Sequence, residues 1–240
     1  MSASLDHRDL GSAVSASGLA RPTDEAELLR RARALAGHTL GEIARRLHKT
    51  CPDDPRRTKG WAGEIVELAL GADAGSKPEP DFIELGVELK TIPINERGHP
   101  RESTHVCAIS ASDCQGARWE SSRARSKLAR VLWMPVQATA MLPLPERTIG
   151  QAVLWSPSAA EEAQLRRDWE ELIEMIALGR GSAISGEQGV YLQVRPKAAS
   201  GRSRTTGPDS DGRRTAMLPL GFYLRPSFTA AILARHYAAM

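Results

Sequence analysis

The spacing of apolar and polar residues divides the chain into helical and extended segments. Three early segments carry apolar residues at helical spacing: 23–37, 39–47 and 61–71. Thr23 and Asp24 can cap the first of these predicted helices, and Thr39 with Glu42 forms a capping box that opens the second. Gly71 is a typical terminator of the third. The first third of the chain is therefore predicted to be mainly helical.

Short strands are predicted next, followed by a return to helix. Runs of β-branched and apolar residues bounded by Gly, Pro or Ser predict strands at 81–85, 87–94, 105–110, 131–136, 191–197 and 221–224. Ser158 and Glu161 form a second capping box, which opens a helix with one apolar stripe that ends before Gly179. Residues 198–215 read as a mobile basic loop and 227–240 as a closing helix. Helices and strands in alternation indicate an α/β or α+β domain.

Length and composition are those of a soluble globular protein. With 240 residues, 41% of them hydrophobic, the chain can bury a core as one large domain or as two packed lobes. Residues 1–22 are small, polar and aperiodic, which predicts a flexible tail before a single domain over 23–240. Cys51, Cys107 and Cys114 form no CxxC pair, so a disulfide framework or zinc knuckle is not indicated. Without a signal peptide or a membrane-length apolar run, we expect a cytoplasmic protein with no membrane partner.

Positive charge is concentrated toward the C-terminus. Residues 191–240 hold eight basic and two acidic side chains, whereas residues 156–190 hold three basic and seven acidic ones. Such a basic segment attracts polyanions, above all nucleic acid, although it is equally compatible with a solubilising surface.

Ionisable residues stand among strand-forming ones in DFIELGVELK, residues 81–90. On a strand, Glu88 and Lys90 share one face while Leu89 points to the other. A glycine turn can bring Asp81 beside Glu88, and Glu67 on the preceding helix can supply a third carboxylate. Two carboxylates about 4 Å apart repel by roughly 4 kcal/mol at an intermediate dielectric, so a fold that converges them must protonate one or bind a cation.

Hard oxygen ligands favour Mg²⁺, and the carbonyl of Leu89 is a further candidate ligand beside Asp81, Glu88 and Glu67. A cation held there would polarise a phosphate, and Lys90 could orient the attacking water or stabilise developing negative charge. This set is suited to phosphodiester hydrolysis. The alternative for the same residues is the solvated face of an ordinary hairpin.

Seven motifs in order resemble one known family. They are KGWAGEIVELALG, GSKPEPDFIELGVELKTIP, KLARVLWMPV, VLWSP, DWEELIEMI, YLQVRPKAA and GFYL. From about residue 23 to the end, the chain is similar to MutH, the family of strand-discriminating endonucleases of DNA mismatch repair. The resemblance implies a restriction-endonuclease-like fold, in which a mixed sheet flanked by helices forms two lobes around a DNA cleft. It also implies a monomeric, Mg²⁺-dependent enzyme that nicks the unmethylated strand at hemimethylated GATC sites and is activated by MutL, which mismatch-bound MutS recruits.

The resemblance assigns the cleavage centre residue by residue. It implies that Asp81, Glu88 and Lys90 are the catalytic core, that Glu67 adds an acidic group, and that Lys127 is a further active-site lysine. Lys127 belongs to a basic run, residues 121–133, which by itself is equally typical of a solvated surface.

DNA contacts are implied at four further positions. Lys59 falls where the family contacts DNA, and Arg195, Lys197 and Tyr223 match its DNA-recognition segment. Arg195 and Lys197 alternate on a predicted strand, as phosphate or guanine contacts require, yet they could also decorate a sheet edge. Tyr223 is the candidate sensor of adenine methylation, with a core tyrosine as the alternative.

Two departures from the family pattern affect DNA contacts and not the cleavage centre. His105 stands where the family has an aromatic residue, and Leu220 where a basic residue is familiar. Two other functions remain open from the sequence: a GATC-specific restriction endonuclease that cuts both strands, and a non-catalytic DNA-binding protein.

Overall fold

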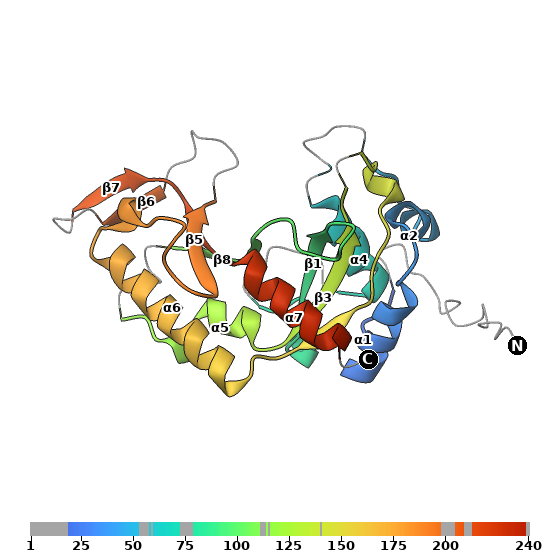
Figure 1. Ribbon diagram of the computed structural model, residues 1–240, viewed down its shortest axis with the longest axis horizontal. Coiled ribbons are helices and arrows are strands. Elements are labelled where there is room, and N and C mark those ends of the chain that lie inside the picture. The colour runs from blue at the N-terminus through green and yellow to red at the C-terminus, as the bar shows by residue number, and fades with distance from the viewer. Residues whose placement is uncertain are drawn as a thin grey trace, which may run out of the picture.

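Two three-stranded sheets and the helices around them make up most of the computed structural model (Figure 1). The structure describes residues 19–52, 58, 60–72, 79–110, 114, 116–139, 141–197, 205–208 and 213–238. The main helices are α1 (Glu25–Ala34), α2 (Leu40–Arg46), α4 (Trp61–Leu70), α5 (Arg123–Leu128), α6 (Ala159–Ala177) and α7 (Pro226–Ala238). The strands are β1 (Glu88–Ile94), β2 (Thr104–Ile109), β3 (Val131–Gln137), β4 (Val153–Trp155), β5 (Leu192–Pro196), β6 (Thr205–Pro208), β7 (Arg214–Met217) and β8 (Leu220–Leu224). One sheet has the order β1-β3-β4, the other β2-β8-β5, and β6 and β7 form a separate hairpin.

Side-chain caps fix where the long helices begin. The Asp24 side chain accepts a hydrogen bond from the backbone of α1, and both predicted capping boxes, at the start of α2 and of α6, are present. Each satisfies backbone N–H groups that would otherwise have no partner in the first turn. Gly71 ends α4 in the left-handed conformation, with φ of 75°. These sequence predictions are confirmed.

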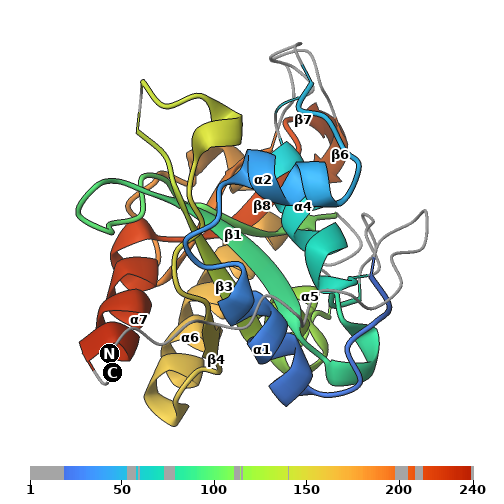
Figure 2. The ribbon, with the colours of Figure 1, turned by 90° about the vertical axis from the view of Figure 1, so that its right-hand side faces the viewer.

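The β1-β3-β4 sheet separates two hydrophobic clusters. On β3, Val131 and Trp133 pack into one cluster, while Leu132 and Met134 pack into the other. Successive side chains of a strand point to opposite faces, so both faces of this sheet are buried, as is usual for the parallel pair β1 and β3. Figure 2 shows α1 and α4 in front of β1 and β3, with α6 behind them and α7 to one side.

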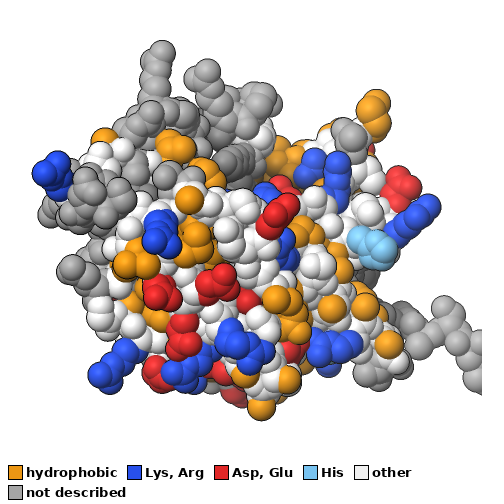
Figure 3. Space-filling model, turned by 60° about the vertical axis from the view of Figure 1, so that its left-hand side comes forward, with side chains coloured by type: hydrophobic (Ala, Val, Ile, Leu, Met, Phe, Trp, Pro, Cys, Tyr) orange, Lys and Arg blue, Asp and Glu red, His pale blue; other side chains and the backbone are white. Residues whose placement is uncertain are grey.

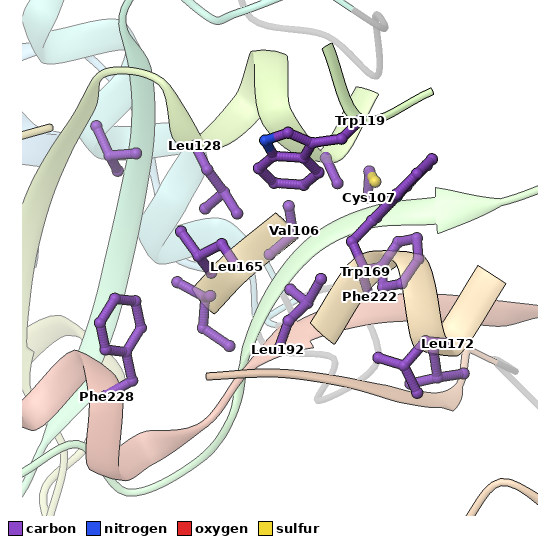
Figure 4. Packing of buried hydrophobic residues seen from close by; sticks show 14 of the residues in the cluster. Val106, Cys107, Trp119, Leu128, Leu165, Trp169, Leu172, Leu192, Phe222 and Phe228 are labelled. Atoms are coloured by element: carbon purple, nitrogen blue, oxygen red, sulfur yellow. The ribbon is translucent and has the colours of Figure 1, made fainter. Parts of the chain in front are cut away.

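The larger cluster lies between the two sheets and is rich in aromatic side chains. Figure 4 shows Trp119, Trp169 and Phe222 among the side chains that point into it. The ring centroids of Trp119 and Trp169 are 5.8 Å apart, and the rings of Tyr191 and Phe228 stack at 4.0 Å. Because both sheets contribute to this cluster, they are held together by a shared core.

Charges are mixed on the side of the molecule that carries α6. Figure 3 shows acidic and basic side chains interspersed on that side. On α6 itself, the Arg166 guanidinium lies 2.7 Å from a Glu170 oxygen and 2.8 Å from an oxygen of Glu120. These charges largely offset one another, as expected for a solvated helix face.

Two predicted segments were assigned wrongly. Residues 81–85 do not form a strand: Phe82 makes one bridge with Val87, and Ile83–Leu85 is a 3₁₀ turn that Gly86 closes with φ of 64°. Because the 3₁₀ turn takes up Ile83–Leu85, too few extended residues are left to pair with β1 as a strand. The predicted mobile loop 198–215 contains strand β6 and the start of β7, which pair with each other, while 198–204 and 209–212 lie outside the described residues.

The fold class is confirmed as mixed α/β, with parallel and antiparallel pairs flanked by helices. The arrangement of two lobes around DNA stays a prediction. The flexible tail predicted over residues 1–22 also stays a prediction, because residues 1–18 are not described. Among the described helices, none is both long and apolar enough to cross a membrane.

Candidate active site

Glu88, the first residue of β1, is held by two lysines. The Nζ atom of Lys90 donates to Glu88 Oε1 at 2.5 Å, and Nζ of Lys127 donates to Oε2 at 2.7 Å. Glu88 is only 2% exposed. A buried carboxylate is costly unless charged partners satisfy it, and here each oxygen has one. The predicted common face of Glu88 and Lys90 is confirmed by this contact.

Lys127 reaches the site because α5 leads directly into β3. Since β3 runs parallel to β1 and pairs Val131 with Glu88, the last turn of α5 lies beside the start of β1. Lys127 is 6% exposed and also donates to the backbone oxygen of Glu79 at 2.6 Å. A solvated surface, the alternative for the basic run, does not apply to this lysine.

Asp81 lies beside the same strand. Its Oδ2 accepts a hydrogen bond from the backbone N–H of Leu89 at 2.8 Å. The Gly86 turn makes this contact possible because it returns the chain so that β1 begins next to Asp81. Burial, and then the charge of Glu88, raise the pKa of Asp81, although the Leu89 hydrogen bond and nearby lysines oppose the shift.

Glu67 joins the same electrostatic environment from α4. Helix α4 packs against β1 through Ile65 and Val66, which are fully buried. Burial, and then the charge of Asp81, raise the pKa of the Glu67 carboxyl, while Lys90 partly offsets them. The four ionisable residues predicted by local spacing, and Lys127, are therefore brought together around the start of β1.

The donor set fits a hard divalent cation. The pKa of Glu67 is raised partly by the charge of Asp81, and that of Asp81 partly by the charge of Glu88, so a bound cation would relieve repulsion among these carboxylates. The described residues contain no preformed group of three or more metal-ligating side chains, and both oxygens of Glu88 are occupied by lysines. The predicted ligands Asp81, Glu88, Glu67 and the Leu89 carbonyl stay a prediction.

The residues predicted to recognise DNA lie on and beside the β2-β8-β5 sheet. Tyr223 on β8 is half-buried, and Arg195, near the end of β5, is exposed. Lys197 follows β5, and its backbone N–H donates to the Pro219 oxygen at 2.7 Å. Lys59 lies outside the described residues.

His105 connects these two groups of residues. Burial, and then the charges of Lys197, Lys90 and Lys127, lower the pKa of His105 to about 4. The imidazole thus lies within the electrostatic range of Lys197, which is predicted to contact DNA, and of the two lysines that bind Glu88. The departure from the family pattern indicated that His105 affects DNA contacts, but residue spacing could not indicate that it lies near Lys90 and Lys127, because these residues come from distant parts of the chain.

Comparison with known proteins gives a family. Residues 70–168 match the family model described as "MutH: DNA mismatch repair enzyme MutH". The chain is 50% identical over 218 residues to the DNA mismatch repair protein MutH of Yersinia pestis (strain Pestoides F), covering 91% of this chain and 96% of the relative. It is 53% identical over 213 residues to the protein of the same name from Haemophilus ducreyi, covering 89% and 94%. The protein belongs to the MutH family of DNA mismatch repair enzymes, which are endonucleases.

Proposed function

We propose that this enzyme is a Mg²⁺-dependent endonuclease that nicks the unmethylated strand at hemimethylated GATC sites and is activated by MutL. Family membership supplies the broader activity, a divalent-metal-dependent nuclease that acts on DNA in mismatch repair. The metal's identity, the target sequence, the strand choice and the activator are the parts proposed.

One observation carries the proposal: Glu88 bound by Lys90 and Lys127 beside the raised-pKa carboxyls of Asp81 and Glu67. On an ordinary hairpin such charges would be exposed to water, where an ion pair contributes little to stability. Here the buried side chain of Lys127 and the half-buried side chain of Lys90 both contact the buried Glu88 at the start of β1. Buried charge concentrated in one place is typical of a catalytic centre.

Asp81, Glu67 and Glu88, with the Leu89 carbonyl, would hold the ion, and when bound it would supply Lewis-acid stabilisation of the phosphate. The ammonium of Lys90 orients the attacking water and stabilises the negative charge that develops on the phosphate oxygens. The water oxygen forms a bond to phosphorus and releases one proton to the solvent, while the bond between phosphorus and the 3′-oxygen breaks. The 3′-oxygen takes up a proton, which leaves a 3′-hydroxyl and a 5′-phosphate.

A single cleavage centre suits a nick. The described chain places one such set of residues at the start of β1, so a monomer acts on one phosphodiester. A restriction enzyme that cuts both strands needs a second centre through a dimer or another domain. Family membership favours the mismatch repair role over that alternative and over a non-catalytic DNA-binding protein.

Strand choice is proposed to depend on Tyr223. Methylation replaces one hydrogen on N6 of adenine, which faces the major groove, and a closely fitted side chain there would detect the added bulk. Arg195 and Lys197, beside Tyr223 on the same sheet or just after it, supply contacts to phosphate or guanine.

A plasmid assay tests the proposal. Closed circular DNA with GATC sites methylated on one known strand is incubated with enzyme, Mg²⁺ and MutL. We expect open circles with the nick in the unmethylated strand, and no cleavage by D81A although DNA binding persists. E84Q is the matched control because Glu84 lies in the same turn but its side chain is 74% exposed. Linear product would indicate a restriction enzyme, and equal nicking of unmethylated, hemimethylated and fully methylated DNA would contradict strand discrimination.

A further inference from the structure

Three side chains form a row across the β2-β8-β5 sheet. His105 on β2 and Gln193 on β5 are both paired in register with Tyr223, which lies on the central strand β8. Residues directly opposite each other in antiparallel strands have their side chains on the same face, about 4.5–5.5 Å apart at Cβ. Tyr223 therefore has His105 on one side and Gln193 on the other.

The rings of His105 and Tyr223 pack edge to face above a glycine. Their centroids are 5.1 Å apart and their planes meet at 69°. A Cβ atom on Gly221 would lie 3.2 Å from the backbone oxygen of Cys107, 3.3 Å from Cε2 of Tyr223 and 3.5 Å from Cδ2 of His105. Any larger residue at Gly221 would push the Tyr223 ring, because 3.3 Å is closer than such contacts normally allow. The two rings thus rest on the bare backbone of β8.

His105 packs against Tyr223 through its ring. Its Nε2 atom is buried and has no hydrogen-bond partner among the described residues. Burial of a polar atom without a partner is unfavourable. The low pKa keeps the ring uncharged at neutral pH, beside Lys197, Lys90 and Lys127. The contact that remains for this imidazole is the edge-to-face packing with Tyr223.

Gln193, on the opposite side of Tyr223, is fixed by hydrogen bonds. Its Nε2 donates to Oγ of Ser103 at 2.8 Å, and its Oε1 accepts from Nε of Arg195 at 3.4 Å. Gln193 is 1% exposed. Gln193, held in this way, and His105 therefore flank Tyr223 on its two sides, and His105 is the flanking residue that contacts the Tyr223 ring edge to face.

We propose that His105 is a positioning residue that sets the orientation of the Tyr223 ring and thereby the discrimination between methylated and unmethylated DNA. The second half of this inference rests on the proposed function, which makes Tyr223 the methylation sensor. The first half concerns the free protein and is tested without DNA.

The first experiment follows the tyrosine rings by NMR in the full-length protein. The chain has three tyrosines, so ring-selective ¹³C labelling gives few signals, and Tyr191 and Tyr237 serve as internal references. We expect H105A to shift the Tyr223 signals, because a neighbouring ring is lost, and to leave both references unchanged. H105F, which keeps an aromatic ring, should retain a single ordered environment for Tyr223. The exposed His99 provides the control H99A, which should move none of the three.

The second experiment measures Kd for unmethylated and fully methylated GATC duplexes in the absence of divalent ions, so that no cleavage occurs. The discrimination ratio is the Kd for the fully methylated duplex divided by the Kd for the unmethylated duplex. We expect H105A to reduce this ratio by about threefold or more, and H105F to keep it within about twofold of wild type. G221A should reduce the ratio as well, because the new methyl group crowds the Tyr223 ring together with the Cys107 carbonyl of β2. G186A is its matched control, since a Cβ atom on Gly186 has nothing within 4 Å.

Unchanged Tyr223 signals in H105A would overturn the positioning role. A Kd ratio in H105F as low as in H105A would also overturn it, because ring packing would then not be the cause. If wild-type protein binds both duplexes equally, the proposed sensing function fails, while the NMR comparison still decides whether His105 holds Tyr223. H105F and G221A keep the test decisive if H105A does not fold.

Discussion

The Nζ atom of Lys127, on α5, lies 2.7 Å from Oε2 of Glu88, the first residue of β1, and both side chains are almost completely buried. Lys90 binds the other oxygen of Glu88, so the two lysines and Glu88 together have a formal charge of +1. The two ammonium groups offset part of the negative charge that Asp81 and Glu67 add beside them, and they can stabilise a scissile phosphate.

Replacing Lys127 with methionine should affect both stability and cleavage. K127M keeps most of the side-chain volume and leaves Glu88 with Lys90 as its one ammonium partner. Removing the sole partner of a buried ion costs about 3–5 kcal/mol, so with Lys90 retained we expect a loss of roughly 1–3 kcal/mol. The nicking rate should fall by about a hundredfold. Urea unfolding and the plasmid assay measure the two effects.

The double variant separates these effects. Adding E88Q to K127M removes the buried charge that was left with one partner, so stability should recover in part while nicking stays low. If K127M unfolds at the same urea concentration as wild type, the ion pair between Lys127 and Glu88 contributes nothing to the free energy of unfolding. The role assigned to Lys127 would then be wrong.

Divalent ions should stabilise the folded protein through Asp81. At a hundredfold excess over Kd, binding contributes about 2.7 kcal/mol, which raises Tm by roughly 5–10 °C in a chain of this size. D81N and E67Q should lose most of this increase, and EDTA should reverse it in wild type. The control E84Q should behave as wild type. A D81N protein with the full increase in Tm would show that the ion binds elsewhere.

Contacts set by local spacing could be predicted from the sequence. The helix caps at Asp24, Thr39 and Ser158 depend on residues within one turn, and the shared face of Glu88 and Lys90 depends only on strand geometry. Each of these contacts joins residues close together in the sequence, so it could be predicted without knowledge of the tertiary fold. Each is confirmed.

Contacts between distant segments could not be derived from spacing. Lys127 meets Glu88 only because β3 pairs in parallel with β1, and nothing in the basic run distinguishes Lys127 from its solvated neighbours. His105 and Gln193 likewise gain their importance from the register of β2 and β5 with β8. The failed strand at 81–85 shows the opposite case, in which the left-handed Gly86 overrides strand-forming residues.

Stability should fall in mild acid because of His105. The unfolded imidazole titrates near 6.5, whereas in the folded protein burial and the charges of Lys197, Lys90 and Lys127 lower its pKa to about 4. Between these values the unfolded state binds more protons, so the free energy of unfolding decreases as pH falls from 6.5 toward 4. For a half-buried ring screened by solvent, we expect a contribution of about 1–2 kcal/mol.

Urea unfolding at several pH values measures this contribution. H105F has no group that titrates at this position, so its stability should change less between pH 6.5 and 4 than that of wild type. It should also be more stable than wild type at pH 7, because an unpaired buried nitrogen is replaced by carbon. Parallel pH profiles for the two proteins would contradict a depressed pKa at His105.

Lys197 should contribute to DNA affinity without reading sequence. Its side chain is exposed just after β5, where a phosphate contact would release counterions from DNA. We expect K197A to weaken binding to GATC and non-GATC duplexes alike and to lower the slope of log K against log salt concentration by about one. Arg195 differs, because R195K keeps the charge but loses the bidentate geometry that guanine recognition needs, so its defect should be larger on GATC DNA. Fluorescence anisotropy between about 50 and 200 mM salt distinguishes the two, with K49A as a control at an exposed lysine that follows α2. A K197A slope equal to that of wild type would place Lys197 outside the DNA contact.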